Sequence, residues 1–336
     1  MEHIFEQYDL FLDFEDDNAN NDNKKNVFGI TQNSSVSQNI FNNIKHYSNS
    51  EYQYLHLLQT ILDNGTWENG RNGRVQSIFG HSMRFSLKNN SIPILTTKKT
   101  AWKTCLKELL WFISGKTNNL ILQAQGVHIW DANATPEFLE GRGLNHYEPG
   151  ELGPIYGHQW RHFGAPWKGD RDYDGFGFDQ LQNIIDELKN PETRASRRII
   201  LSAWNPCQLD KMALPPCHIV CQFNVHDDNK LSCALFQRSG DSFLGVPFNI
   251  ASYSFLTHLL AHHCGLEAYE FVHFLGNAHL YEEHIDAAKL QLERKPKDLP
   301  CLHIKKLREN INDYTVDDFE INNYFSHDAI KVDIVA

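Results

Sequence analysis

The sequence lacks any long uncharged apolar run and any excess of basic residues. A membrane-spanning helix needs about 20 consecutive apolar residues, and no stretch of that kind is present. The 31 Lys and Arg are outnumbered by 42 Asp and Glu, which gives a formal net charge of −11. General nucleic-acid binders neutralise phosphates with a basic surface, so this balance argues against that class and leaves a small anionic ligand open.

The spacing of the cysteines carries no disulfide pattern. Seven cysteines are an odd number, and they lack the short repeated spacings of a disulfide scaffold. No segment resembling a signal peptide precedes them. With 41% hydrophobic and 22% charged residues, the composition is that of a folded soluble protein. We therefore expect a reduced, soluble protein of the cytoplasm.

Two regions of the chain differ in composition. Residues 1–50 are acidic and rich in Asn, and from about residue 13 they hold too few apolar side chains to offset the entropy of ordering. We expect this N-terminal extension to be disordered. A globular pattern covers residues 51–336, with no internal repeat and no charged linker, and this predicts one large domain.

Apolar periodicity and turn residues predict a mixture of helices and strands. Helices are expected over 52–64, over 98–114, from Pro247 to Cys264, and from near His279 onward. Runs of β-branched or aromatic residues predict strands at 199–201, 219–225, 231–236 and 269–275, whereas 132–178 is expected to form long loops. Because no regular βαβ alternation appears, this order predicts an α+β fold around one large mixed sheet.

The first candidate for a catalytic residue is a cysteine that follows a rigid segment of chain. Cys217 follows two prolines and comes just before a predicted strand. Arg197 and Arg198 precede it in the sequence and Arg238 follows it, and nearby guanidinium groups favour the thiolate that a nucleophile needs. On spacing alone, simple packing of a buried cysteine is the commoner explanation.

The second candidate is a carboxyl group. Glu108 lies inside an apolar predicted helix, beside Leu109 and Leu110. Burial disfavours the ionised form and raises the pKa of such a carboxyl toward the range useful for proton transfer. A structural ion pair with a lysine such as Lys98 is the alternative.

Two groups have spacings that a metal could use, and we expect neither to bind one. The helical group lacks the adjacent Glu of a zinc-hydrolase helix, and the strand group lacks a distant matching pair. These groups are His258, His262 and His263 on a helix, and Cys217, His218 and Cys221 around a strand.

Three further polar side chains lie at the ends of predicted elements. Asn249 falls in the first turn of the helix opened by Pro247, where a carboxamide suits either pairing with a base or capping. His279 and Tyr281 are two residues apart at the start of another predicted element. Ligand binding and plain exposure to solvent both fit this pair.

Nine segments, in the same order, together resemble the thymidylate synthase family over about residues 52–336. They are Ser77–Gly80, Leu95–Lys99, Lys107–Trp111, Ile129–Asp131, Gly153–Arg161, Met212–His218, Gln237–Asp241, Pro247–Tyr253 and His279–Tyr281. The long loop region at 132–178 is similar to that of eukaryotic-type members. The resemblance implies the family's α+β fold, with the large mixed sheet forming a homodimer interface.

The resemblance also implies a reaction. It is the reductive methylation of dUMP to dTMP, with 5,10-methylenetetrahydrofolate as a cosubstrate that supplies carbon and hydride and leaves as dihydrofolate. The Cys217 thiolate would add to C6 of the uracil and make C5 nucleophilic. Glu108 with ordered water and Tyr156 would serve the proton transfers at O4 and C5, and Asp241 is counted with the catalytic residues. No metal is implied.

Binding residues follow from the same resemblance. Arg238, Ser239 and Arg71 would hold the phosphate, and Arg197 and Arg198 would reach it from the partner subunit, which makes dimerisation obligatory. The remaining implied contacts are Asn249 with the uracil, His279 and Tyr281 with the ribose, Gln237, Asp241 and Gly245 as the nucleotide wall, and Trp130, Asp131, Gly245 and Ala336 at the folate.

Three departures from the family pattern leave questions open. The N-terminal loop is one residue shorter than usual, so Arg74 is an alternative to Arg71 as the phosphate ligand. Asn277 stands where an Asp is usual, which removes a charge. Val335-Ala336 inverts the common ending of the segment that closes over folate.

Two rival functions are compatible with parts of this pattern. A deoxynucleotide hydroxymethylase would quench the same intermediate with water instead of hydride. Asn249 argues against the dCMP type, which is expected to carry Asp there because mismatching a buried pair costs about 1–3 kcal/mol, but it does not argue against a dUMP type. A catalytically silent paralogue that binds nucleotide or RNA would lack the nucleophile or a phosphate ligand, and the sequence retains both.

Overall fold

The computed structural model describes residues 49–70 and 72–335, which all belong to one compact unit, His46–Ala336. Residues 1–48, which make up nearly all of the predicted extension, lie outside the described residues, as do Arg71 and Ala336. Within the described part of the chain, no helix is long and apolar enough to cross a bilayer.

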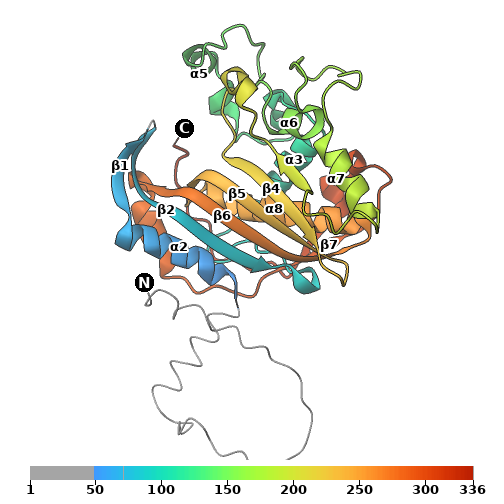
Figure 1. Ribbon diagram of the computed structural model, residues 1–336. Coiled ribbons are helices and arrows are strands. Elements are labelled where there is room, and N and C mark those ends of the chain that lie inside the picture. Colours follow the sequence, from blue (N-terminus) through green and yellow to red (C-terminus); the bar gives the residue numbers. More distant parts are fainter. Residues whose placement is uncertain (1–48, 71, 336) are drawn as a thin grey trace, which may run out of the picture. The chain divides into compact units, whose positions relative to one another are not determined.

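A six-stranded mixed sheet forms the centre of this unit (Figure 1). Its neighbours are antiparallel except for β5 and β6, which are parallel. In spatial order the strands are β1 (Thr66–Gly70), β2 (Gly73–Ser86), β6 (Glu267–Tyr281), β5 (Lys230–Asp241), β4 (His218–Val225) and β3 (Ile200–Ser202). A separate pair joins β7 (Cys301–Ile304) to β8 (Phe319–Asn322). The predicted α+β class with one large mixed sheet is confirmed.

The long helix α8 (Gly245–Cys264) connects the two parallel strands. Parallel neighbours cannot be joined by a hairpin, so the chain needs a crossover between β5 and β6. α8 is apolar on nearly every side and packs against both strands and against α3 (Trp102–Ile113). Gly265 ends the helix at φ 71°, the left-handed conformation that glycine adopts without strain, as the sequence predicts.

The first described helix is anchored at its start by a buried carboxylate. Glu51 begins α2 (Glu51–Asn64), and its two carboxylate oxygens accept hydrogen bonds from the backbone and hydroxyl groups of Thr96 and Thr97 at 2.6–3.0 Å. α2 packs against β2 and buries Tyr54 and Ile61 in the core. The remaining α-helices of the described residues are α4 (Asn119–Gln123), α5 (Pro136–Gly141), α6 (Tyr156–His162), α7 (Gln180–Lys189) and α9 (Ile285–Leu292). Short 3-10 helices lie at Lys88–Asn90, Asp131–Ala134, Pro206–Lys211, Glu282–His284, Ile311–Asp313 and Val316–Asp318.

Several predicted element boundaries were wrong. The second helix begins at Trp102 and not at 98, because residues 96–99 form turns. The region 132–178 is not all loop, since it contains α5 and α6. His279 and Tyr281 lie on β6, which is paired on both sides, and the next α-helix starts at Ile285. Asn249 lies in the second turn of α8, because this helix begins at Gly245.

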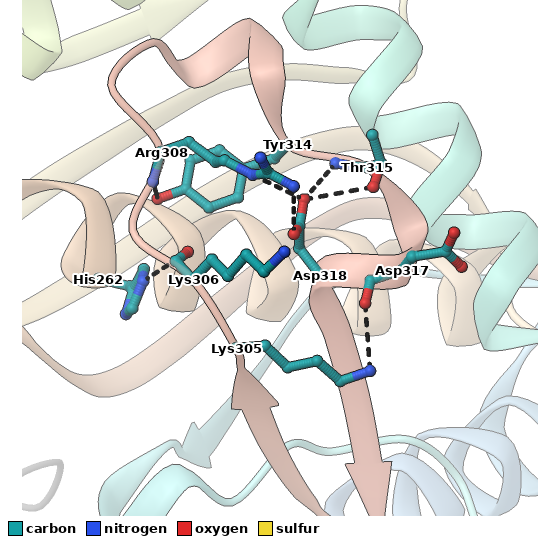
Figure 2. A network of polar contacts seen from close by, with 8 residues as sticks. All are labelled: His262, Lys305, Lys306, Arg308, Tyr314, Thr315, Asp317 and Asp318. Atoms are coloured by element: carbon teal, nitrogen blue, oxygen red, sulfur yellow. Dashed lines mark hydrogen bonds and ion pairs between the residues drawn. The ribbon is translucent and has the colours of Figure 1, made fainter.

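A polar network fixes the chain between β7 and β8 (Figure 2). Asp318 accepts hydrogen bonds from Arg308 Nη2 at 2.7 Å and from the backbone of Thr315 at 2.9 Å. Burial alone would raise the pKa of Asp318, but these hydrogen bonds hold it below its usual range. His262, near the end of α8, donates to the carbonyl of Lys306 at 3.1 Å. The network therefore ties this hairpin to the helix behind the sheet.

Candidate active site

Cys217 lies directly before β4, and strand pairing brings an arginine to it. β4 and β5 pair with His218 opposite Gln237, so Arg238 comes next to the cysteine. Nη2 of Arg238 lies 3.8 Å from Sγ of Cys217, and the Arg238 amide donates to the Cys217 carbonyl at 2.8 Å. A guanidinium this close favours the thiolate over the thiol. The structure thus gives this cysteine the electrostatic setting of a nucleophile.

The guanidinium of Arg238 is itself held in place. Its Nε donates to the carbonyl of Pro216 at 2.8 Å and its Nη2 to that of Pro215 at 3.0 Å. Proline fixes its own φ, so these carbonyls form a rigid acceptor pair. The two prolines before the nucleophile therefore orient the arginine beside it as well as the thiol.

Glu108, on α3, is a buried carboxyl with one strong hydrogen bond. Its Oε1 accepts from the indole Nε1 of Trp130 at 2.7 Å. Burial raises the pKa of Glu108 to about 7, although the hydrogen bond from Trp130 acts in the opposite direction. The alternative ion pair with Lys98 is wrong, because Lys98 Nζ donates to the Phe243 carbonyl and lies 3.5 Å from the centre of that ring. Glu108 can therefore both give and take a proton near neutral pH.

Aromatic and polar side chains pack together between these two groups. The hydroxyl of Tyr156 accepts a hydrogen bond from the Cys217 amide at 2.8 Å, and its ring stacks on His218 with centroids 4.0 Å apart. The Nδ1 of His218 lies 2.8 Å from the hydroxyl of Tyr253. Burial lowers the pKa of His218 to about 3 and raises that of Tyr156. Both side chains are therefore neutral at pH 7, and Tyr156 keeps a proton to donate.

A cleft of about 730 Å³ opens beside Cys217. Its volume falls in the range of small-molecule sites. Six predicted site residues line it: Cys217, Arg238, Ser239, Asp241, His279 and Tyr281. The parallel register of β5 and β6 pairs Ser239 with Asn277 and Asp241 with His279, so two stretches far apart in the sequence form one wall.

Hydrogen bonds fix the orientation of the side chains on this wall. Oδ1 of Asp241 accepts from the amides of Phe243 and Leu244 at 2.9 and 3.2 Å, just before α8. Nδ1 of His279 lies 2.9 Å from Oδ1 of Asn277, which must accept, so this ring nitrogen carries a proton. Burial lowers the pKa of His279, whereas the nearby Asp241 raises it. Nε2 of His279 is then left as an acceptor for a hydroxyl.

Known proteins are similar to this chain over the whole region that carries the site. The family model described as thymidylate synthase matches residues 52–336. The chain belongs to the thymidylate synthase family. It is 48% identical to the bifunctional dihydrofolate reductase-thymidylate synthase of Plasmodium berghei over 99% of this chain. It is 50% identical to the thymidylate synthases of equine herpesvirus 2 and Homo sapiens over 84% of this chain.

The relatives differ in how much of their own length is matched. The match covers 98% of the equine herpesvirus 2 protein and 90% of the human protein. It covers 57% of the bifunctional Plasmodium berghei protein, so the chain spans little more than half the length of that relative.

Some of the site residues implied by the family resemblance lie around the cleft without lining it. Gln237 is buried, donates to the Ser239 carbonyl at 2.9 Å and accepts from His273 at 2.8 Å. Gly245 begins α8 next to Asp241. Asn249 makes no side-chain hydrogen bond with the described residues, so its donor and acceptor remain available to a ligand.

The folate residues implied for this family also have structural partners. Trp130 donates to Glu108, whereas its neighbour Ile129 lines the cleft. Asp131 accepts from Asn119 at 2.8 Å and is 2.9 Å from Nδ1 of His128. These bonds hold the pKa of Asp131 below its usual range, against the effect of burial. The 3-10 helix that carries Asp131 is thereby fixed at the cleft edge.

The arginines expected at the phosphate are not all in one place. Arg71 lies outside the described residues, as does the predicted folate residue Ala336. Arg74 forms an ion pair with Glu282 at 2.8 Å and does not line the cleft. Arg197 and Arg198 are exposed and also lie away from it.

Sequence reasoning missed several polar residues that line the cleft, namely Glu68, Asn72, His128, Asn133 and Arg142. Nη2 of Arg142 donates to the carbonyls of Leu209 and Met212 at 3.3 and 3.2 Å, in the segment that leads to the nucleophile. Its sequence signal is slight, an arginine between two glycines. Among the described residues, no cluster of three His, Cys, Asp or Glu side chains could hold a metal ion.

Proposed function

We propose that this protein converts dUMP to dTMP as a thymidylate synthase, with 5,10-methylenetetrahydrofolate as cosubstrate and dihydrofolate as second product. One observation carries the proposal: the Cys217 thiol lies 3.8 Å from Arg238 at a cleft that Ser239, His279 and Tyr281 also line. Family membership supports the choice of substrate. The reaction belongs to de novo dTMP biosynthesis and needs no metal.

The thiolate of Cys217 adds to C6 of the uracil ring, which makes C5 a carbon nucleophile. Arg238 stabilises the thiolate and, with Ser239, holds the phosphate of dUMP. Its Nε and Nη2 bind the two proline carbonyls, and its Nη1 makes no hydrogen bond with the described residues. That donor is available for a charge-assisted bond to phosphate. We retain Arg71 as the third phosphate ligand.

Glu108 and Tyr156 serve the proton transfers at O4 and C5 of the pyrimidine. A carboxyl whose pKa is about 7 exists in both protonation states at neutral pH, which suits a group that must act twice. Tyr156 already accepts from the Cys217 amide, so its own proton points elsewhere. Asp241 contributes by holding the start of α8 in place against the nucleotide wall.

Base and ribose are recognised by neutral side chains. The carboxamide of Asn249 offers one donor and one acceptor, which match O4 and N3–H of uracil. His279 and Tyr281 bind the ribose hydroxyl, and Gln237 completes the wall behind them. The folate supplies a one-carbon unit and a hydride when bound. Trp130, Asp131, Gly245 and Ala336 border its site.

The outer face of the sheet supports a homodimer. Phe236 and Phe274 lie opposite each other on β5 and β6 and are 41% and 44% exposed, and Ile200 on β3 is 45% exposed. Val220 continues the row on β4. Large apolar side chains on an uncovered sheet face mark an interaction surface. We assign this face to a second copy of the chain.

Dimerisation also explains the two exposed arginines. Arg197 and Arg198 come just before β3, an edge strand of this sheet, and do not line their own cleft. In a dimer they reach the partner's phosphate. Mixing an inactive Cys217→Ser protein with an inactive Arg198→Glu protein should then restore activity, because one hybrid site has both groups. Absence of any restored activity after subunit exchange argues against the shared site.

We assign the chemistry to residues 51–336 and place the enzyme in the cytoplasm, where a thiol nucleophile stays reduced. The decisive experiment is incubation with dUMP and 5,10-methylenetetrahydrofolate, with mass analysis of the nucleotide and absorbance of dihydrofolate. dTMP with stoichiometric dihydrofolate supports the proposal. Hydroxymethyl-dUMP with tetrahydrofolate means a hydroxymethylase, and the lack of any product means a silent paralogue.

A further inference from the structure

The C-terminal segment, residues 329–335, runs along the cleft. Ile334 and Val335 line the cleft, and Ile330 and Val332 pack partly buried against the core. A Cβ placed on Gly73 would lie 3.9 Å from atoms of both Val335 and Tyr281, so the segment passes close to the ribose end of the nucleotide wall. Figure 1 shows the last described residues of this segment near the β1–β2 end of the sheet.

One polar contact attaches this segment to the body of the protein. Within the described residues, its single hydrogen bond runs from Nε2 of His284 to the carbonyl of Asp333 at 2.9 Å. A carbonyl only accepts, so Nε2 carries a proton. His284 is 1% exposed, whereas Asp333 is exposed. A buried ring from the body therefore holds a peptide group at the surface.

The other side of the same ring faces the nucleotide wall. The ring of His284 packs edge-on against Tyr281 with centroids 5.7 Å apart, and 5.6 Å from the ring of Phe243. Its Nδ1 lies 4.0 Å from Oδ1 of Asp241 and has no hydrogen-bond partner among the described residues. Both Asp241 and Tyr281 line the cleft. His284 thus contacts the wall and the C-terminal segment at once.

We propose that His284 is a positioning residue that holds the C-terminal segment over the cleft and fixes its place relative to the nucleotide wall. It lies behind the wall and acts through Asp333, Asp241 and Tyr281. The proposal rests on the proposed function in one respect, that the cosubstrate binds beneath the segment. The attachment itself is a property of the protein without substrate, and it can be tested that way.

Two substitutions separate the hydrogen bond from the packing. His284→Phe keeps an aromatic ring against Tyr281 and Phe243 but has no donor. His284→Gln places an amide donor at nearly the reach of Nε2. His258→Phe is the matched control, because His258 is also buried and also donates to a carbonyl, that of Ser91 at 2.9 Å, away from the segment.

The first measurement is the rate at which carboxypeptidase releases C-terminal residues from each folded variant, with no substrate present. Loss of one hydrogen bond corresponds to about a fivefold to tenfold larger population of the detached segment. His284→Phe should be digested faster by that factor, and His284→Gln and His258→Phe should resemble wild type. Unchanged digestion of His284→Phe, or equal acceleration in His258→Phe, overturns the proposal.

The second measurement is steady-state kinetics on the same proteins. His284→Phe should raise the KM for the folate more than the KM for dUMP, and His284→Gln should restore most of the difference. Equal increases in the KM for the folate and the KM for dUMP would overturn the proposal, because they would mean that the His284 ring only supports the nucleotide wall. If the protein makes no dTMP at all, the proposed function fails while the digestion result still decides the role of His284.

Discussion

Two buried glutamates, at the start of α2 and in the middle of α3, show how the same side chain is used in opposite ways. Glu51 is 1% exposed, and its carboxylate accepts five hydrogen bonds from the backbone and hydroxyl groups of Thr96 and Thr97. Glu108 is 9% exposed and accepts one, from Trp130. The two carboxyl groups are buried to a similar extent, but they accept different numbers of hydrogen bonds.

The difference teaches that burial alone does not define a catalytic carboxyl. An ionised carboxylate has about four lone-pair sites, and at Glu51 polar hydrogens fill them, so the group joins two segments of chain. Glu108 accepts too few hydrogen bonds to offset its burial, and burial raises its pKa to about 7. A pKa that burial shifts this far is typical of functional sites. Substitutions at the two glutamates separate these two uses.

The largest expected effect is at the nucleophile that Glu108 serves. Cys217→Ser should abolish turnover, because a serine hydroxyl beside Arg238 is not ionised at neutral pH. Binding of dUMP should persist, and calorimetric titration measures it. The matched control is the exposed Cys207, whose change to Ser should leave activity intact. Full activity in Cys217→Ser would falsify the assignment of the nucleophile.

Glu108→Gln should lower kcat by about 100-fold to 10,000-fold, the usual contribution of a positioned acid or base. The amide oxygen still accepts from Trp130, so the local structure should be kept. Rate measurements from pH 5 to 9 check the cause: the wild-type profile should change near pH 7, and the residual profile of the variant should not.

At and above neutral pH, Glu108→Gln should also be more stable to unfolding than wild type. The pKa of Glu108 is higher in the folded protein than in the unfolded chain. Burial of this carboxyl therefore costs wild type no stability below about pH 4.5. The cost grows to about 3 kcal/mol as the pH rises toward 7. Glu108→Gln should gain on wild type over that window. Thermal midpoints measured at pH 5 and pH 8 test this, and an equal difference at both pH values would contradict it.

Glu51→Gln should destabilise the protein by about 3 kcal/mol. The amide NH₂ of glutamine would face N–H and O–H groups that now donate hydrogen bonds to a carboxylate oxygen. Activity per folded molecule should stay near wild type. The exposed Glu140→Gln is the control, and its unfolding midpoint should hardly move. If Glu51→Gln proves as stable as Glu140→Gln, the structural half of the contrast is wrong.

Asp318 offers a third, intermediate case with a smaller effect. Its partner Arg308 is partly exposed, so Asp318→Asn should cost about 1–2 kcal/mol at pH 7. The folded pKa of Asp318 is lowered, so its contribution is present above about pH 4 and lost as pH falls further. Unfolding midpoints of wild type and variant should therefore converge as the pH falls below about 4.

Much of this fold was predictable because its elements carry strong periodic patterns. α8 and β4 are examples, since each is apolar enough to be recognised without neighbours. The hairpin of β1 and β2 was not predicted, because every residue of β1 is exposed and shows no alternation. The true end of β6 was also missed. Gly276-Asn277 suggests a break, but pairing with β2 and β5 on both sides carries the strand on to Tyr281.

Prediction of the site has a similar limit. The motif around Cys217 pointed to the nucleophile, and nearby charge pointed to Arg238. The hydrogen bond between Trp130 and Glu108 joins residues of separate elements, so no local pattern contains it. His284 and Arg142 act on backbone carbonyls, which every residue has, and the sequence therefore carries no record of their partners.

The parallel pairing of β5 with β6 has a consequence for how activity emerges during folding. Half of the nucleotide wall is made before α8 and half after it, and the halves meet only through contacts distant in sequence. Such contacts form late and slowly, because loop-closure entropy must be overcome first. Substrate-binding competence should therefore appear in the last refolding phase, after helical signal has already returned.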